Sequence, residues 1–423
     1  MEAKPIRPRA VSPAILAWYI YDWAIAPYAV LVLTFIFATY FAAMVAPDKI
    51  TGTQAWGWAI TGSTLVIAVA SPLLGAAIDH SGRRKPWLAA FTLLCVAATA
   101  GLWWIAPSPA LMLPALLLVG LSNIGFGLSN VAYNAMLPLV APPERLGLVS
   151  GIGWSVGYFG GLACLGLALA IVLPRPPPFG LDPATAETVR ATMPLTALWF
   201  ALFALPLFFV VPDGTRRDRR EGGAGSSLRE LAETVRLIWR EKRLLRFLAA
   251  NMLYIDGLNT IFAFGGIYAA GSFEMSVEQV LMFGIAMNLT AGLGAALFGL
   301  IEDRLSAHRT IFLSLILLLG LGATILLVRS AVLFWAAALA LGLFVGPVQS
   351  ASRSRLVQLA PPGMTARLFG FLALSGRATA FIAPAALALV TGLADSQRAG
   401  MATILPFLAG GLVLLGRPAK SGK

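Results

Sequence analysis

Long apolar segments recur twelve times along this chain of 423 residues. Each is close to the roughly 20 residues that a helix needs to cross the apolar core of a lipid bilayer. The segments cover residues 14–46, 54–78, 87–106, 110–137, 148–173 and 192–211, and then residues 246–271, 277–301, 310–328, 331–352, 367–393 and 399–416. The pattern predicts an all-α integral membrane protein with twelve transmembrane helices.

The composition excludes a water-soluble fold. Only 12% of the residues are charged and 58% are hydrophobic, whereas a soluble domain averages about 25% charged residues. The two cysteines, Cys95 and Cys164, lie in apolar segments, which excludes a disulfide scaffold. A net charge of +12 would suggest nucleic acid in a soluble protein, but these cations lie in short segments between apolar runs. We therefore expect no nucleic-acid partner.

The basic residues predict the orientation in the membrane. Twelve spans place both termini on one side of the bilayer. If that side is the cytoplasm, the outer segments hold five basic residues, and one more, Arg377, lies inside a span. The five are Lys49, Arg175, Arg190, Arg329 and Arg398. The other 25 of the 31 Lys and Arg residues are then cytoplasmic, as the positive-inside rule requires. We expect a bacterial inner (plasma) membrane protein with both termini in the cytoplasm.

A polar linker separates the two sets of six spans. Within it, apolar residues recur at helical intervals opposite several arginines, at Leu228, Leu231, Val235, Ile238, Trp239 and Leu245. This predicts a basic amphipathic helix that contacts lipid at the inner membrane surface, and a calmodulin-like partner site is the alternative. The predicted domains are an N-terminal six-helix bundle over residues 1–211, a cytoplasmic linker over 212–245 and a C-terminal six-helix bundle over 246–423.

An internal repeat relates the two sets of spans. Several residues recur 219 positions later, namely Ala141, Pro142, Pro143, Gly151 and Gly157 as Ala360, Pro361, Pro362, Gly370 and Gly376. A second match pairs Gly75 and Asp79 with Gly299 and Asp303. Many secondary transporters consist of a duplicated six-span unit. We therefore expect two pseudo-symmetric six-helix bundles.

Three short segments resemble a known family. The run Gly75-Ala-Ala-Ile-Asp-His-Ser-Gly-Arg-Arg-Lys85 resembles the loop between spans two and three of the major facilitator superfamily, with a histidine where an arginine is usual. Within that superfamily, Tyr21-Asp-Trp-Ala24 and the run from Asn134 through Ala141-Pro-Pro-Glu-Arg145 resemble the autophagy-related vacuolar effluxers and their bacterial relatives. The chain departs from that group after Ala24, where Ile-Ala-Pro replaces a polar Asn-Ser pair. The resemblance implies the major facilitator fold and, for the yeast members, export of amino acids from the vacuole.

The cytoplasmic loops carry candidate gating residues. Asp79 is expected at the end of span two, where it can accept hydrogen bonds from a helix N-terminus or pair with an arginine. Contacts of this kind would break when the two halves rock apart. A simple topology anchor at the anionic inner leaflet is the alternative, particularly for the cations. The candidates are Asp79, Gly82, Arg83, Arg84, Arg145 and Asp303.

Charged residues inside spans are costly and mark functional sites. Counted at about 1.5 Å per residue, Asp22, Asp256 and Arg377 reach the middle of the membrane, where alternating-access carriers bind substrate. We expect Arg377 to anchor the cavity, with one of the two aspartates as its counter-ion and as the proton carrier. A purely structural ion pair is the alternative. Arg353 and Arg355 are expected at the inner end of span ten, near lipid headgroups or the opposing loop.

Further polar residues within the spans are candidates for a substrate cavity. Asparagine is expensive in lipid unless it faces water or a partner, so hydrogen bonding between helices is the competing explanation. The candidates are Tyr19, Tyr28, Asn123, Asn130, Trp154, Tyr158, Asn259, Asn288 and Gln349.

Enzymatic activity is not expected. The run Gly153-Trp-Ser-Val-Gly157 fits the G-x-S-x-G pattern of hydrolases, but it lies in an apolar helix, and the two histidines lie in loops. The chain also lacks a P-loop and a metal-ligand cluster, so we expect no cofactor.

The sequence as a whole predicts a monomeric secondary carrier. It would move a small polar organic solute, possibly an amino acid, by alternating access, with a proton or another coupling ion. A lipid or amphiphile exporter is the alternative if a cavity between spans five and eight opens sideways. A non-transporting membrane receptor or scaffold is the alternative from a different class.

Overall fold

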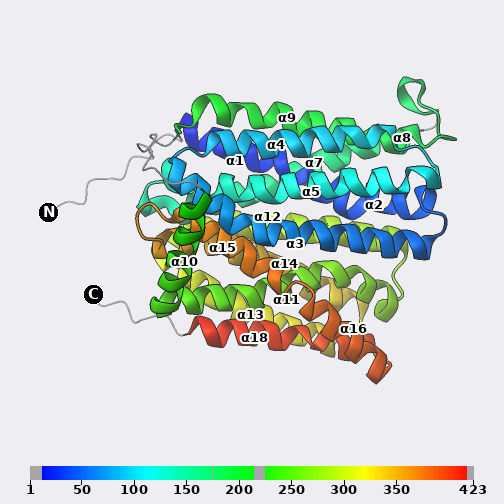
Figure 1. Cartoon of the computed structure of the whole chain (residues 1–423). Helices are drawn as coiled ribbons and strands as arrows, with labels where there is room; N and C mark the ends of the chain where they lie inside the picture. The colour runs from blue at the N-terminus through cyan, green and yellow to red at the C-terminus, as the bar shows by residue number, and fades with distance from the viewer. Residues whose placement is uncertain (1–11, 175, 214–223, 417–423) are drawn as a thin grey trace, which may run out of the picture.

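Twelve helical spans run side by side in the computed structural model (Figure 1). The structure describes residues 12–174, 176–213 and 224–416, without the side chains of residues 224–230 and 277–278. The first span begins and the last span ends at the same end of the bundle, which we call the terminal end. The opposite end is the far end. The predicted all-α architecture with twelve membrane spans is confirmed for the described residues.

The first six spans cover Pro13–Val45, Lys49–Ser81, Lys85–Trp104, Pro109–Val140, Pro143–Val172 and Glu187–Val210. The first of them changes at Pro27 from an α-helix to a π-helical segment. Their helices are α1 (Pro13–Pro27), η1 (Tyr28–Phe35), α2 (Phe37–Tyr40), η2 (Phe41–Val45), α3 (Lys49–Ser81), α4 (Lys85–Gly101), η3 (Leu102–Trp104), η4 (Pro109–Leu111), α5 (Met112–Asn134), α6 (Leu137–Val140), η5 (Pro143–Arg145), α7 (Leu146–Val172), η6 (Pro178–Gly180), α8 (Glu187–Arg190) and α9 (Thr192–Val210).

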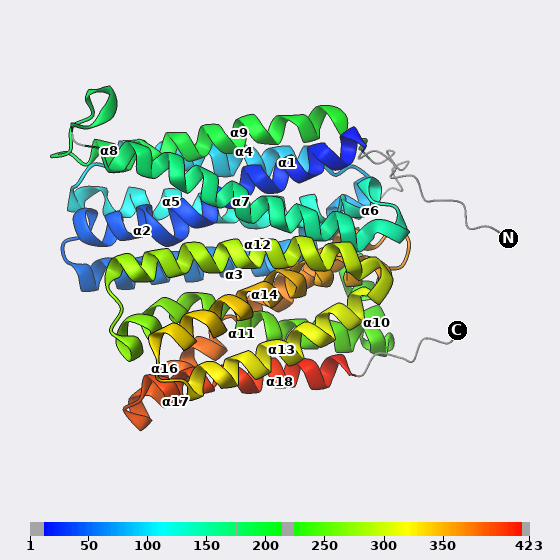
Figure 2. The same ribbon diagram turned by 180° about the vertical axis from the view of Figure 1, so that it is seen from behind.

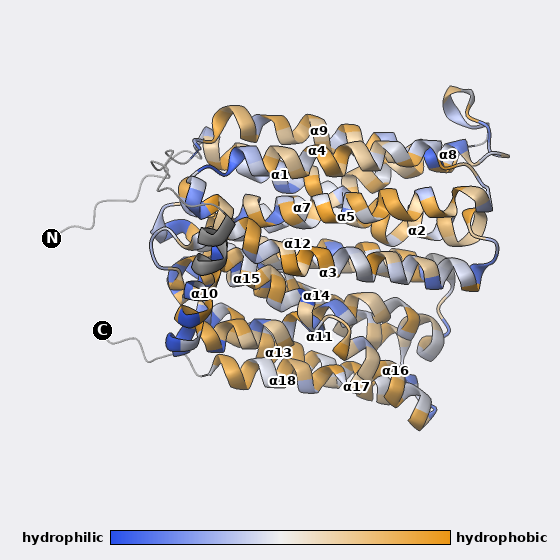
Figure 3. Ribbon diagram, in the orientation of Figure 1, coloured by the Kyte–Doolittle hydropathy of each residue, from blue (hydrophilic) through white to orange (hydrophobic). Residues whose placement is uncertain are grey.

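The last six spans cover Lys242–Phe273, Gln279–Leu305, Ala307–Leu327, Ala331–Leu359, Thr365–Ala394 and Gln397–Leu415. Their helices are α11 (Lys242–Phe273), α12 (Val277–Leu305), α13 (Ala307–Leu327), α14 (Ala331–Leu359), α15 (Thr365–Ala378), α16 (Ile382–Ala394), α17 (Gln397–Ala402) and α18 (Ile404–Leu415). Figure 3 shows hydrophobic residues along the lengths of the spans and hydrophilic ones gathered near the ends.

The linker contains the predicted amphipathic helix, α10 (Ala224–Arg240). It lies across the terminal end and contacts α3, α11 and α15 (Figure 1). Nη1 of Arg367 lies 3.5 Å from the hydroxyl oxygen of the buried Thr234, whereas Trp239 is exposed. Residues 214–223 lie outside the described part of the chain, so the predicted domain limits stay a prediction.

The two sets of spans meet through paired helices, with α3 packed along α15 (Figure 1) and α7 along α12 (Figure 2). Repeated glycines lie at both crossings. A Cβ added at Gly151 would lie 2.6 Å from the Cα of Gly299, and one added at Gly370 would lie 2.8 Å from the Cα of Pro72. Backbones can approach this closely only where side chains are absent. The repeated residues therefore make equivalent contacts between the two sets of spans.

Candidate functional site

A buried ion pair joins the two sets of spans. Nη2 of Arg353, in α14, lies 3.3 Å from Oδ2 of Asp22, in α1, and their side chains are 5% and 12% exposed. Arg353 also donates to Oδ1 of Asn134 at 3.0 Å and to the hydroxyl and carbonyl oxygens of Ser150 at 3.2 Å. These contacts give the guanidinium N–H groups acceptors on several sides, and a buried charge requires such partners.

This pair corrects two expectations. Arg353 was expected at the inner end of span ten, but α14 continues to Leu359 and the side chain is buried. Asp22 was a candidate counter-ion of Arg377, but it pairs with Arg353 instead.

A polar cavity of about 280 Å³ lies between the two sets of spans. It is lined by residues of α5, α7, α11, α14 and α15. Those with polar side chains are Asn130, Asn134, Trp154, Asn251, Asn259, Gln349, Ser352, Arg353 and Arg377. Two guanidinium groups beside several carboxamides make a cavity suited to a polar, negatively charged group.

Arg377 lies at this cavity, one residue before the end of α15. Within the described residues, its guanidinium makes no hydrogen bond or ion pair with another side chain. Arg353 differs, because Asp22 balances its charge. The positive charge at the cavity that lacks a protein counter-ion is therefore that of Arg377.

The eleventh span is broken beside Arg377, between the end of α15 at Ala378 and the start of α16 at Ile382. Asp256 of α11 is 1% exposed, and its Oδ2 accepts a hydrogen bond from the amide of Ala383 at 3.2 Å. Its Oδ1 has no hydrogen-bond partner among the described residues. Asp256 therefore caps the second half of a broken helix, and the expected pair with Arg377 is not formed.

At the terminal end, Asp79 of α3 binds the start of α15. Oδ1 accepts a hydrogen bond from the amide of Ala366 at 3.2 Å, and Oδ2 accepts one from the amide of Arg367 at 2.9 Å. Nε of Arg367 lies 3.5 Å from Oδ2. A carboxylate is favourable there, because the first amides of a helix lack partners within it. The contact is of the expected kind, and the role of Asp79 in gating stays a prediction.

Asp303 of α12 makes the equivalent contact with α7. Its carboxylate accepts hydrogen bonds from the amides of Gly147 at 2.8 Å and Leu148 at 3.2 Å. These residues precede Ala366 and Arg367 by the 219 positions of the repeat. We call the contacts of Asp79 and of Asp303 the two latches. Together they hold the two sets of spans in contact at the terminal end.

The other candidate gating residues surround the latches. Gly82 ends α3 with a φ of 68°, a conformation that favours glycine. Nε of Arg83 lies 3.6 Å from Oδ2 of Asp213. Arg84 donates to the carbonyl of Ala135 at 3.0 Å. Burial lowers the pKa of the Arg84 guanidinium, against the opposing effect of nearby carboxylates, and the group remains a cation. The last candidate, Arg145, lies within electrostatic range of the Asp303 latch.

The remaining candidates from the sequence divide into two groups. Trp154, Asn259 and Gln349 line the polar cavity, and the hydroxyl of Tyr158 donates to Oε1 of Gln349 at 2.7 Å. Asn288 lines a second, apolar cavity, which is described below.

Tyr28, Asn123 and Tyr19 line neither of these two cavities. The hydroxyls of Tyr28 and Ser122 lie 2.8 Å apart, and Asn123 donates to the hydroxyl of Ser63 at 2.8 Å. These are hydrogen bonds between helices of the first set of spans. Tyr19 packs beside Trp18, with ring centroids 6.1 Å apart.

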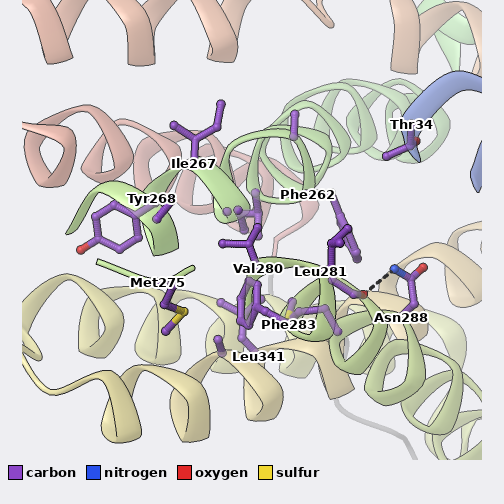
Figure 4. A pocket seen from close by; sticks show the side chains of 18 of the residues that line it. Thr34, Phe262, Ile267, Tyr268, Met275, Val280, Leu281, Phe283, Asn288 and Leu341 are labelled. Atoms are coloured by element: carbon purple, nitrogen blue, oxygen red, sulfur yellow. Dashed lines mark hydrogen bonds between the residues drawn. The ribbon is translucent and has the colours of Figure 1, made fainter. Parts of the chain in front are cut away.

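The second cavity is larger and apolar, with a volume of about 760 Å³ (Figure 4). It lies between η1 and the halves of α11 and α12 nearer the far end, and its lining includes Phe262, Ile267, Phe283 and Leu341. Asn288 turns its amide to the carbonyl of Gly284, at 2.8 Å. Asn259 lines both cavities, so the apolar cavity adjoins the polar one.

Comparison with protein families gives one match over most of the chain. The family model described as vacuole effluxer Atg22 like matches residues 59–146 and 144–419. The chain is 25% identical to the MFS-type transporter YxiO of Bacillus subtilis over 410 residues, which cover 94% of this chain and 93% of YxiO. It is 26% identical to autophagy-related protein 22 of Cryptococcus neoformans over 292 residues, which cover 64% of this chain and 50% of that protein.

Solved structures show the same fold. The proton:xylose symporter XylE superposes with a TM-score of 0.74 at 12% identity and covers 95% of this chain, with 94% of XylE matched. The human organic anion transporter MFSD10 superposes with a TM-score of 0.69 at 18% identity, over 97% of this chain and all of that one. At 12% and 18% identity, the similarity to these two structures shows the fold alone.

Proposed function

This chain belongs to the family of Atg22-like vacuole effluxers, and we propose that it is a proton-coupled secondary carrier of a small polar organic solute that bears a carboxylate, such as an amino acid. Its family and its fold are those of transporters rather than enzymes. The carrier would act as a monomer in a bacterial inner membrane, with lipid around it and with the terminal end in the cytoplasm.

The observation that carries the proposal is the unpaired charge of Arg377 at the polar cavity. A guanidinium in the membrane interior costs roughly 2.5–3.5 kcal/mol even on insertion scales. A substrate carboxylate would offset that cost through two parallel hydrogen bonds, which the planar fork of arginine suits. The amide side chains of Asn251 and Asn259 offer further donors and acceptors for the rest of the solute.

The closed terminal end supports transport by alternating access. Both latches join the first six spans to the last six, while the polar cavity lies between the same sets of spans. Breaking the latches would let the spans separate at the terminal end and expose the polar cavity there. A solute bound in the polar cavity could then leave at the terminal end.

The test is ligand binding to the purified protein. Amino acids, sugars, nucleosides and lysolipids are screened by thermal shift, and the stabilising compounds are then tested for uptake into proteoliposomes with and without a pH gradient. We expect stabilisation by carboxylates, and loss of that binding in Arg377→Gln. The exposed Arg329→Gln is the matched control. Unchanged carboxylate binding by Arg377→Gln would overturn the assignment.

The apolar cavity favours a second candidate, an amphiphile exporter. Because Asn259 lines both cavities, one ligand with an anionic head could reach Arg377 while its apolar body fills the larger cavity. A leucine side chain at Gly284 would project toward Phe35, which lies 3.5 Å from the position of an added Cβ. Gly284→Leu should then weaken binding of long-chain carboxylates and spare short ones. Gly57→Leu, where an added Cβ meets nothing within 4 Å, is the control.

A further inference from the structure

Glu302 is a buried carboxyl group that neither the latches nor the cavities use. It lies in α12, directly before the latch residue Asp303, and is 1% exposed. Among the described residues, neither of its carboxyl oxygens has a hydrogen-bond partner. Buried carboxylates normally accept several hydrogen bonds or face a cation in contact, so this arrangement requires an explanation.

The side chain lies where the two sets of spans touch. A Cβ added at Gly147, in α7, would lie 2.7 Å from the Cβ and 2.8 Å from the Cδ of Glu302, so the carboxyl packs directly on the backbone of α7. On the side of α14 it faces the hydroxyl of Ser354 and the guanidinium of Arg353. On α12 itself, the neighbouring charge is Asp303.

The nearby arginine does not neutralise Glu302 by contact. Arg353 directs its N–H groups to Asp22, Asn134 and Ser150. The hydroxyl of Ser354 stabilises the anion of Glu302 only in part, because it also bonds the carbonyl oxygens of Leu146 and Ser350. A buried carboxylate with so little stabilisation is strongly unfavourable, whereas the neutral acid avoids most of the desolvation cost. The closed terminal end therefore favours the protonated form of Glu302.

We propose that Glu302 is a proton-binding switch of the terminal end, which takes up one proton from the solution at that end when the latches close and returns it when they open. The proposal rests on the carrier function proposed above, because it requires the two sets of spans to separate. Separation would withdraw Gly147 and admit water to Glu302. A glutamate in water ionises well below neutral pH, at about pH 4, so opening would release the proton.

The direction of the pH effect follows from linkage. The closed form binds one proton more than the open form, so raising the pH favours the open form, by at most tenfold per pH unit for one proton. Asp79 and Asp303 stay unchanged when Glu302 alone is replaced, so that replacement isolates the effect of Glu302 on the pH dependence.

Distance measurement between spin labels at the terminal end tests the switch. Nitroxides are attached at the exposed positions Ala89→Cys and Arg304→Cys, on α4 and α12, after the buried Cys95 and Cys164 are replaced by alanine. Closed and open populations are measured in lipid nanodiscs from about pH 5 to about pH 9, without substrate. The original Glu302 is compared with Glu302→Gln and with Glu144→Gln, a substitution at an exposed glutamate of the same end.

We expect the protein with Glu302 and the Glu144→Gln variant to open as the pH rises above neutrality. Glu302→Gln should lose this alkaline opening. Retention of the alkaline opening in Glu302→Gln, or its absence from both proteins that keep Glu302, would overturn the switch. If alkaline opening depends on Glu302 but no solute is transported, the switch holds and the carrier function fails. If a solute is transported without alkaline opening, the carrier holds and the switch fails.

Discussion

Arg353 ties the two sets of spans together through a single side chain. A buried ion pair adds stability only when its geometry and further hydrogen bonds offset the desolvation of both charges. The guanidinium meets this condition with the carboxylate of Asp22, the amide oxygen of Asn134 and two oxygens of Ser150. All three partners belong to the first six spans, so these contacts persist only while the two sets stay together at this depth.

Removing one partner of this pair should therefore destabilise the protein more than removing both. We expect Asp22→Leu to lower the free energy of unfolding by about 3–5 kcal/mol, because it leaves a buried guanidinium without its counter-ion. The double variant Asp22→Leu/Arg353→Met should recover much of the loss without recovering transport. Thermal unfolding and uptake assays measure the two effects. A double variant no more stable than Asp22→Leu would contradict the pairing.

The residues of the site were predictable from the sequence to different degrees. Asp79 and Asp303 could be found because a motif and its repeat mark them. Arg353 could not, because the apolar run ends near residue 352 and the polar residues that follow predict a helix end at the membrane surface. Those residues face the other set of spans instead of lipid, so the helix continues through them. The polarity of a segment alone does not show whether its residues face water or a polar interface within the protein.

At the scale of helices, glycine determines how closely the two sets of spans approach. A Cβ at Gly151 would lie 2.6 Å from both the carbonyl oxygen of Ala295 and the Cα of Gly299. Neither is a flexible side chain, so α7 or α12 would have to shift. The crossing of α3 with α15 is limited in the same way by Gly75, where an added Cβ would lie 2.7 Å from the Cα of Arg367.

Gly151→Ala should therefore weaken the closed terminal end. We expect a loss of about 1–3 kcal/mol, typical of overpacking, and a shift toward the open form in distance measurements between spin labels. Gly166→Ala in the same helix is the matched control, because a Cβ there meets nothing within 4 Å. That control should be neutral, or more stable by up to about 1 kcal/mol through helix propensity. Equal behaviour of the two variants would show that the crossing does not limit closure.

The number and order of the spans were predictable, since twelve apolar runs of sufficient length specify twelve helices. The break in the eleventh span was not predicted from the length of its apolar run. Its local signal is Pro384, which lies in the first turn of α16 and cannot donate an amide hydrogen bond. The break also depends on Asp256, which caps the start of α16. Because Asp256 lies in a different span, no local sequence pattern around residue 380 could indicate this cap.

The whole molecule is closed at the terminal end, and the polar cavity lies between the two sets of spans. The repeat predicted two pseudo-symmetric six-helix bundles, and the two latches are equivalent contacts between them. The closed state itself was not predictable, because one sequence must serve at least two arrangements in a carrier, and their energies differ by little. The more populated arrangement is set by small differences in interaction free energy, summed over the whole interface between the two sets of spans.

If the two sets of spans move as rigid bodies, both latches break in one step and their free energies add in one equilibrium. Each of Asp79→Asn and Asp303→Asn removes a charge that binds helix amides, a contact worth about 1–2 kcal/mol. We expect the ratio of closed to open form to fall roughly tenfold in each single variant and roughly a hundredfold in the double variant. Spin-label distances at the terminal end measure the ratio, and uptake assays should show transport lost in all three.

Asp48→Asn is the control for these variants. Asp48 caps the far-end start of α3 through hydrogen bonds from the amides of Ile50 and Thr51, at 2.9 and 3.0 Å, so it has the same chemistry as a latch without touching the other set of spans. It should leave the ratio unchanged. A double latch variant that opens no further than either single variant would mean that each latch opens locally. The rigid-body motion would then be wrong, even though both aspartates bind helix starts.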